Sequence, residues 1–219
     1  MLASGMVSSP RLPLTQERVL REAIRIADED GLEALSMRRL GQALGVEAMS
    51  LYHHVANKAA LMDGILDVVT AEIELPTPGS PWKSALRSTA ISAHNVYLRH
   101  SWAANLTLSA GTGAGRYRYM ESILRCLREG GFSAEMTHHA YHALESHIVG
   151  FTLWLVGISA SLATAGEGEL EDVVRSFETT FPYLYEHAGQ HGRERGPDDP
   201  TEFEFGLDLI LDGLEGMRS

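Results

Sequence analysis

Residues 36–58, SMRRLGQALGVEAMSLYHHVANK, constrain the fold more than any other stretch of the chain. Ser36 is a residue type that caps a helix N-terminus, and Gly45 is suited to end a helix in the left-handed backbone conformation. The apolar residues recur at helical spacing: Met37, Leu40 and Leu44, then Leu51 and Val55. The stretch therefore predicts two short helices, the second at about residues 48–54, joined by a tight turn. Such a helix-turn-helix can place its second helix in the major groove of DNA.

The hairpin pattern alone leaves other functions open. Ordinary helical hairpins share it, and in those Tyr52, His53 and His54 would merely cap a surface turn. The hairpin of a helical dimerisation module would bind protein instead of DNA. A salt-dependent association with a specific DNA site would distinguish a DNA-binding hairpin from these two alternatives.

The composition excludes several classes of protein. A hydrophobic content of 44% and a charged content of 21% are ordinary for a soluble globular protein. We expect no membrane partner, because no apolar run reaches the roughly 18 residues of a membrane span. The N-terminal residues lack the pattern of a secretory signal, and the single cysteine, Cys126, fits a reducing cytoplasm. The expected location is therefore cytoplasmic.

Charge is distributed unevenly along the chain. Residues 1–58 carry seven basic and seven acidic side chains, so the whole formal net charge of −11 lies on residues 59–219. An acidic body repelled by phosphate would hold the neutral, locally basic end toward DNA.

The whole chain is predicted to be all-α, with three parts. Residues 1–14 form a flexible arm, residues 15–75 a three-helix DNA-binding domain with a connecting helix, and residues 82–219 a helical bundle. The segment PTPGSP, residues 76–81, cannot continue a helix and marks the boundary. Helices of the bundle are expected at about residues 82–100, 103–109, 115–129, 134–163, 169–186 and 201–217.

Two of these helices are too apolar for a single chain. Residues 148–162, IVGFTLWLVGISASL, are apolar nearly all round, which predicts burial on all sides. The last helix, with Phe203, Phe205, Leu209 and Ile210, is similar. Together they predict a homodimer, and a twofold dimer suits a palindromic operator in double-stranded DNA.

The N-terminal part resembles the TetR family of bacterial transcriptional regulators. The resemblance rests on GLEALSMRRLGQALGV at residues 31–46 and MSLYHHVANKAALMDGI at residues 49–65, with the specific signature at residues 51–58. It implies a ligand-responsive repressor whose last long helices form a four-helix dimer interface. It also implies DNA contacts at these residues: Met37, Arg38, Ala48, Met49, Ser50, Tyr52, His53, His54 and Lys58. We add Arg18, near the start of the first helix, as a phosphate contact.

Aromatic residues on several helices of the body fit either plain core packing or the wall of a small-molecule pocket, and the family resemblance implies an effector-binding domain. The residues predicted to contact the effector are Tyr97, Trp102, Met120, His147, Phe151 and Trp154. Residues 82–155 resemble the tetracycline repressors, around SPW at residues 80–82 and GGFS at residues 130–133. The positions that would hold a magnesium–drug chelate fall near Thr107 and Trp154, which cannot do so. We therefore expect a larger, more apolar effector than tetracycline.

The alternative is a metal-binding helical protein or enzyme. His138, His142 and Glu145 share one helical face, and histidine and carboxylate are metal ligands. No HExxH order or nearby cysteine supports this alternative. GTGAG at residues 111–115 lacks the strand and the Gly-Lys-Ser/Thr of a phosphate loop. No nucleophile–base motif appears in the sequence. We expect neither an enzyme nor a cofactor.

Overall fold

The computed structural model describes residues 13–109, 113–164, 167–190 and 200–218, and within these ranges the chain is helical with no strand. The all-α prediction is confirmed. Residues 1–12 of the predicted arm and residues 111–112 of GTGAG lie outside the described residues. The helices are α1 Gln16–Asp30, η1 Leu32–Ala34, α2 Met37–Leu44, α3 Ala48–Leu51, α4 Lys58–Thr70, α5 Trp82–Arg99, α6 Ser101–Ser109, α7 Ala114–Glu129, α8 Ala134–Thr164, α9 Glu167–Thr180, α10 Pro182–Gln190 and α11 Glu202–Gly216.

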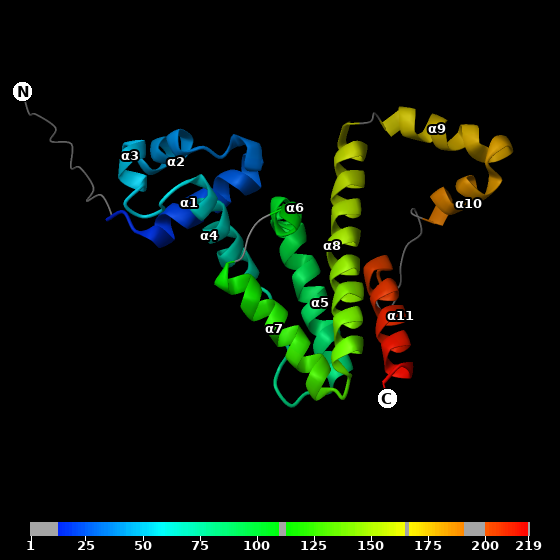
Figure 1. Cartoon of the computed structure of the whole chain (residues 1–219). Helices are drawn as coiled ribbons and strands as arrows, with labels where there is room; N and C mark the ends of the chain where they lie inside the picture. The colour runs from blue at the N-terminus through cyan, green and yellow to red at the C-terminus, as the bar shows by residue number, and fades with distance from the viewer. Residues whose placement is uncertain (1–12, 110–112, 165–166, 191–199, 219) are drawn as a thin grey trace, which may run out of the picture.

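Helices α1 to α3 form a small head at one end of the molecule (Figure 1). The predicted caps are confirmed: the hydroxyl of Ser36 accepts a hydrogen bond from the backbone N–H of Arg39, and Gly45 is left-handed with φ 69°. Gly41 allows α2 and α3 to approach closely, since a Cβ there would lie 2.9 Å from the carbonyl oxygen of Val46. The turn is therefore tight, as the sequence predicts.

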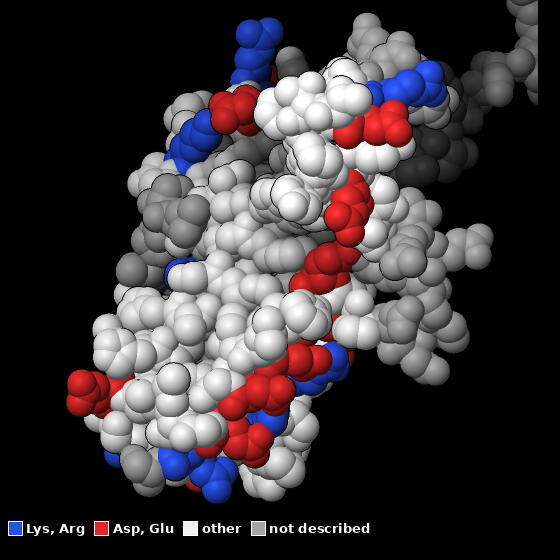
Figure 2. All heavy atoms as spheres, turned by 90° about the vertical axis from the view of Figure 1, so that its right-hand side faces the viewer, with Lys and Arg blue, Asp and Glu red and all other residues white. Residues whose placement is uncertain are grey.

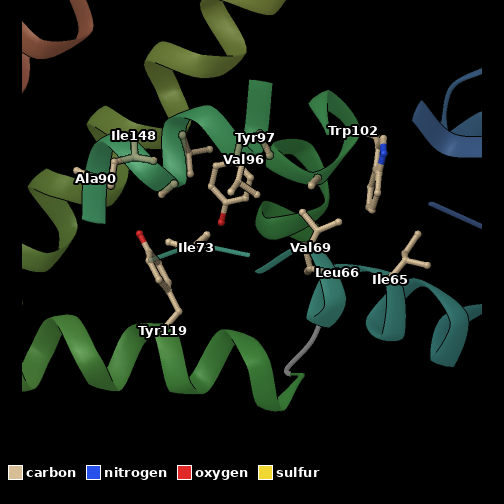
Figure 3. Close-up of a cluster of buried hydrophobic side chains, with 14 of the residues drawn as sticks. Ile65, Leu66, Val69, Ile73, Ala90, Val96, Tyr97, Trp102, Tyr119 and Ile148 are labelled. Carbon is tan, nitrogen blue, oxygen red and sulfur yellow. The ribbon is translucent and has the colours of Figure 1, made fainter. Parts of the chain in front are cut away.

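The body is a bundle in which α5 packs against α8 and α11, and α7 packs against α4 and α8. Figure 1 shows α11 running beside α8, while α9 and α10 extend away from the upper end of α8. Near the centre, Tyr97 of α5 and Tyr119 of α7 are 1% exposed (Figure 3). Ile73, just after α4, lies between them in this view. The chain just after α4 is thus packed into the core of the body, while α4 itself contacts both α1 of the head and α7 of the body.

Most helix boundaries lie close to the predicted positions, with two corrections. The helix predicted at residues 169–186 is two helices, α9 and α10, separated at Phe181. Pro182 has no N–H, so it begins α10 at the position that requires none. Helix α3 is a single turn, and residues 52–54 continue it as turns instead of α-helix.

The sequence predicts that α8 is buried partly against the core of its own chain and partly against a second copy, and in the single chain one face of α8 is open. Trp154 is 49% exposed, and a Cβ added at Gly150 or Gly157 would meet nothing within 4 Å. Residues 134–161 are long and apolar enough to cross a membrane by composition alone. In the bundle the same helix packs against α5, α6, α7 and α11.

Candidate functional site

Helix α3 and the turn after it form an exposed ridge anchored by two buried residues. Leu51 and Val55 are 0% and 4% exposed, and hold the ridge against the head. On the outer side, Met49 is 73% exposed and Tyr52 is 43% exposed. Around them, His53 is exposed, while Ala48, Ser50, His54 and, on α2, Met37 are half-buried. None of these predicted recognition residues is fully buried, and α2, which carries Met37, packs against α3.

Most arginines of the head are neutralised by carboxylates of the head itself. The pairs are Arg21 with Glu17, Arg25 with Glu22 and Glu29, and Arg39 with Asp30. Arg18 donates from Nη1 to the carbonyl oxygen of Pro13 at 2.9 Å. Arg38 and Lys58 are exposed and have no ion pair within the part of the chain that the structure describes. These two cations flank the α3 ridge in sequence and are available to phosphate.

The head is tied to the body at a polar joint on Asp28, near the end of α1. The indole N–H of Trp102 donates to Asp28 Oδ1 at 2.7 Å, and Nδ1 of His100 lies 2.9 Å from the same oxygen. Trp102 is the second residue of α6, and His100 is the C-cap residue of α5 just before it. A second link joins α4 to α7, where the backbone N–H of Gly115 donates to Asp67 Oδ1 at 2.9 Å. These hydrogen bonds join α6 to α1 and α7 to α4.

The histidine face of α8 lacks the carboxylate that a metal site would need. His138 and His142 are exposed, with ring centroids 4.6 Å apart. The Glu145 carboxylate instead accepts a hydrogen bond from the Tyr119 hydroxyl at 2.7 Å, and burial raises its pKa. Among the described residues no group of three or more His, Cys, Asp or Glu is arranged to hold a metal ion. The geometry disfavours the metal-binding alternative.

A cavity of about 840 Å³ opens between α5, α8, α11 and the α9–α10 segment. Its walls are mostly apolar or aromatic, and the residues concerned include Ile91, Leu98, Phe151, Trp154, Ile158 and Phe203. The buried polar residue in the wall is His94 of α5. The volume suits a drug-sized molecule, and the walls suit an apolar one.

The six residues predicted to contact an effector do not lie together. Phe151 and Trp154 line the cavity, and His147 stands beside it, with its ring stacked on Phe203 at 4.8 Å. Tyr97 is buried between α5 and α7, Trp102 is held at the Asp28 joint, and Met120 is half-buried on α7. None of these last three lines the cavity. Their role as effector contacts stays a prediction.

Sequence reasoning missed two residues that shape the cavity, His94 and Phe203. Their rings stack with centroids 3.9 Å apart and an interplanar angle of 6°. One residue is on α5 and the other on α11, so no local pattern signals the contact.

The positions that hold the magnesium–drug chelate in tetracycline repressors fall near Thr107 and Trp154 in this chain. They fit no chelate, since Thr107 is buried and its hydroxyl donates to the carbonyl oxygen of Ala104.

Comparison with known proteins agrees with this architecture. Residues 19–65 match the model of "Bacterial regulatory proteins, tetR family", and residues 75–218 match "Tetracyclin repressor-like, C-terminal domain". The chain is 31% identical over 208 residues to the class C tetracycline repressor of Escherichia coli, covering 94% of this chain and 92% of that protein. It is 30% identical over 228 residues to the repressor DrrR1 of Streptomyces coeruleorubidus, covering 94% and 79%.

A solved structure supports the same assignment. The TetR family protein ActR of Streptomyces coelicolor, in complex with actinorhodin, superposes with a TM-score of 0.72 at 30% identity, covering 95% of this chain and 100% of that chain. Fold, family models and relatives agree over nearly the whole length. The chain therefore belongs to the TetR family and is a ligand-responsive, DNA-binding transcriptional repressor with a C-terminal domain of the tetracycline-repressor type.

Proposed function

We propose that a homodimer of this protein holds a palindromic operator through the α3 ridges of its two heads. The proposed contacts are Arg18, Met37, Arg38, Ala48, Met49, Ser50, Tyr52, His53, His54 and Lys58. The observation that carries this proposal is the exposed ridge, with Met49 and Tyr52 outermost, on the buried anchors Leu51 and Val55. Arg38 and Lys58 would bind phosphate, while Tyr52 and the two histidines would reach phosphate or base edges.

Dimerisation is supported by the open apolar face of α8 and α11. Phe205 and Leu209 on α11 are each 60% exposed, and a Cβ added at Gly150 or Gly157 on α8 would meet nothing within 4 Å. Figure 2 shows the side of the molecule that carries α10 and α11: uncharged side chains cover most of it, and carboxylates form a band from the upper right to the lower centre, with Lys and Arg side chains near its ends. Apolar area of this kind on a soluble protein marks an interface, and a second copy presents the same face under twofold symmetry.

The effector of this repressor is a small, largely apolar molecule that binds the body. The cavity beside α5, α8 and α11 supports this, since its aromatic walls leave few polar groups to satisfy. ActR, at 30% identity, has been solved with actinorhodin. A chelated metal is no part of the proposal, because Thr107 and Trp154 cannot bind one.

Effector binding would act through the joints between body and head. The Asp28 joint reaches α6, and the Asp67 link reaches α7. An effector that binds better to one arrangement of these helices shifts the dimer toward it and changes the spacing of the two heads. In this scheme residues 15–75 are the DNA-binding domain and residues 82–219 the effector-binding and dimerisation domain, acting in the cytoplasm without a membrane partner.

The test is quantitative binding of the full chain to the DNA upstream of its own gene at physiological salt. We expect affinity about 10³-fold or more above that for a scrambled duplex. Tyr52→Ala should lose most of this difference. Tyr117→Ala, which removes a 53% exposed tyrosine from α7, should keep it. Equal, weak binding to both duplexes would refute operator recognition, and full binding by Tyr52→Ala would refute the role of the ridge.

A further inference from the structure

His94 is the buried polar group in the wall of the effector cavity. It is 7% exposed, and its imidazole is packed between aromatic rings. Phe203 stacks on it at 3.9 Å, and Phe151 meets it edge-on at 5.9 Å. Because these contacts hold the ring from α8 and α11, the orientation of His94 does not depend on a ligand.

The hydrogen bonds around His94 assign its tautomer. The hydroxyl of Thr152 donates its single proton to the carbonyl oxygen of Ile148 at 2.6 Å. Thr152 can then only accept from the imidazole, whose Nδ1 lies 2.7 Å from the hydroxyl oxygen. Nδ1 therefore carries the proton. Burial, and to a lesser extent the neighbouring His147, lower the pKa of His94 to about 4, so the ring is neutral at physiological pH.

A neutral imidazole with its proton on Nδ1 presents a bare lone pair at Nε2. Nε2 has no hydrogen-bond partner among the described residues, and it is not among the buried polar atoms sealed from the surface. His147 does not supply a proton to it, because its own Nε2–H lies 2.9 Å from the carbonyl oxygen of Phe203. The cavity wall thus offers one fixed, unoccupied acceptor.

The other polar groups near the cavity do not compete for this role. Asn95 is exposed, and Thr201 and Glu204 are bonded to each other in the capping box of α11. Arg87, the cation near that turn, is bonded to Glu204 and Asp208. Ser159 and Glu202 also line the cavity, and both are exposed to water. His94 is therefore the buried polar group of this wall, and its ring is held between aromatic side chains.

We propose that His94 Nε2 determines effector specificity: the cavity selects a flat aromatic molecule carrying a neutral hydroxyl donor, such as a phenol, over the same skeleton without one. This inference rests on the proposed function, in which this cavity takes the effector. A site built around a polar group rejects analogues that leave that group unpaired. An anionic group in the same place would face the lone pair and is disfavoured.

Two probes of nearly equal shape test the proposal, 2-naphthol and 2-methoxynaphthalene, because the methoxy group cannot donate a hydrogen bond. Binding of each to the full-length dimer is measured by calorimetry at pH 7. We expect the wild-type protein to prefer 2-naphthol by about tenfold. His94→Phe keeps a stacking ring without an acceptor, and should bind both probes alike. The control Leu98→Ala removes apolar wall and should weaken both probes equally while the preference stays.

Equal binding of the two probes by the wild-type protein would overturn the role of His94 whatever the variants do. Binding of neither probe by a protein that still binds its operator would overturn the assignment of this cavity to aromatic effectors, as expected if the second copy fills it. Both outcomes differ from failure of the proposed function, which would appear as the absence of specific operator binding before any probe is added.

Discussion

The side chains that meet DNA in the proposed complex are mostly neutral, and this limits the role of charge at the residue scale. Arg21, Arg25 and Arg39 are paired within the head. Arg38 and Lys58 remain as exposed cations without an ion pair among the described residues. Specificity must then depend on Tyr52, the histidines and apolar contact from Met49, together with the spacing of the two heads.

The salt dependence of operator binding tests this division of roles. Each phosphate contact contributes a slope of about −0.9 to log K against log salt concentration. Arg38→Ala or Lys58→Ala should therefore reduce the slope by about 2 per dimer, since each copy loses one contact. Arg21→Ala, whose cation is occupied by Glu17, should leave the slope unchanged. An unchanged slope in both test variants would mean that these cations do not touch phosphate.

His94 also makes a measurable contribution to pH dependence. Its pKa in the folded protein is about 4, below the ordinary value of 6.5. Between these values the unfolded chain binds a proton that the folded chain does not, so this contribution to stability is lost as pH falls from 6.5 toward 4. The loss should reach about 2 kcal/mol near pH 4.5. Denaturant unfolding of the wild type and His94→Phe at pH 7 and 4.5 measures it, and parallel changes in both proteins would contradict it.

At the scale of elements, the joint between α1 and α6 ties the head to the body. Asp28 accepts hydrogen bonds from the Trp102 indole and faces His100, while Glu72, after α4, pairs with Arg99 at 2.8 Å. Trp102 is 6% exposed, so its indole N–H has little access to water. Without the Asp28 carboxylate, the buried indole N–H of Trp102 would have no acceptor, and the head would be held less firmly to the body.

Asp28→Ala should therefore lower the free energy of unfolding by about 1–3 kcal/mol and weaken operator binding. Asp28→Asn keeps an oxygen acceptor for the indole and should lose less. Denaturant unfolding, followed by tryptophan fluorescence, measures the free energy of unfolding. Glu33→Ala, at an exposed position in the head, is the control. If alanine and asparagine behaved alike, the hydrogen bond to Trp102 would not be what holds the joint.

At the scale of the whole molecule, the proposed homodimer depends on the open face of α8 and α11. Leu209 is 60% exposed in the single chain, and a second copy would bury it. Leu209→Glu places a charge in that interface, where burial without a partner is costly. We expect sedimentation to show monomers at concentrations where the wild type is a dimer, and operator affinity to fall at least about tenfold.

The matched control for the dimer is Tyr117→Glu, a charge added at a 53% exposed position on α7. It should leave both assembly and operator binding intact. A Leu209→Glu protein that remained dimeric would place the interface elsewhere on the body.

The sequence by itself determined the features that depend on neighbouring residues. Ser36 and Gly45 mark the ends of α2 because capping and a left-handed φ are local properties. The helical spacing of Leu51 and Val55 predicted which side of the hairpin is buried, and the signature at residues 51–58 predicted the family. Pro182 shows the limit of this reasoning, since its break in the helix was local and was still missed.

Only the tertiary structure decided which distant residues meet. His94 stacks on Phe203, 109 positions later in the chain, and Trp102 reaches Asp28, which lies in the head. Aromatic residues of the body therefore separate into a cavity wall, a core and a joint, although their spacing on the helices looks alike. The physical reason is that helical periodicity determines which face of a helix is buried, but it does not determine which other helix packs against that face.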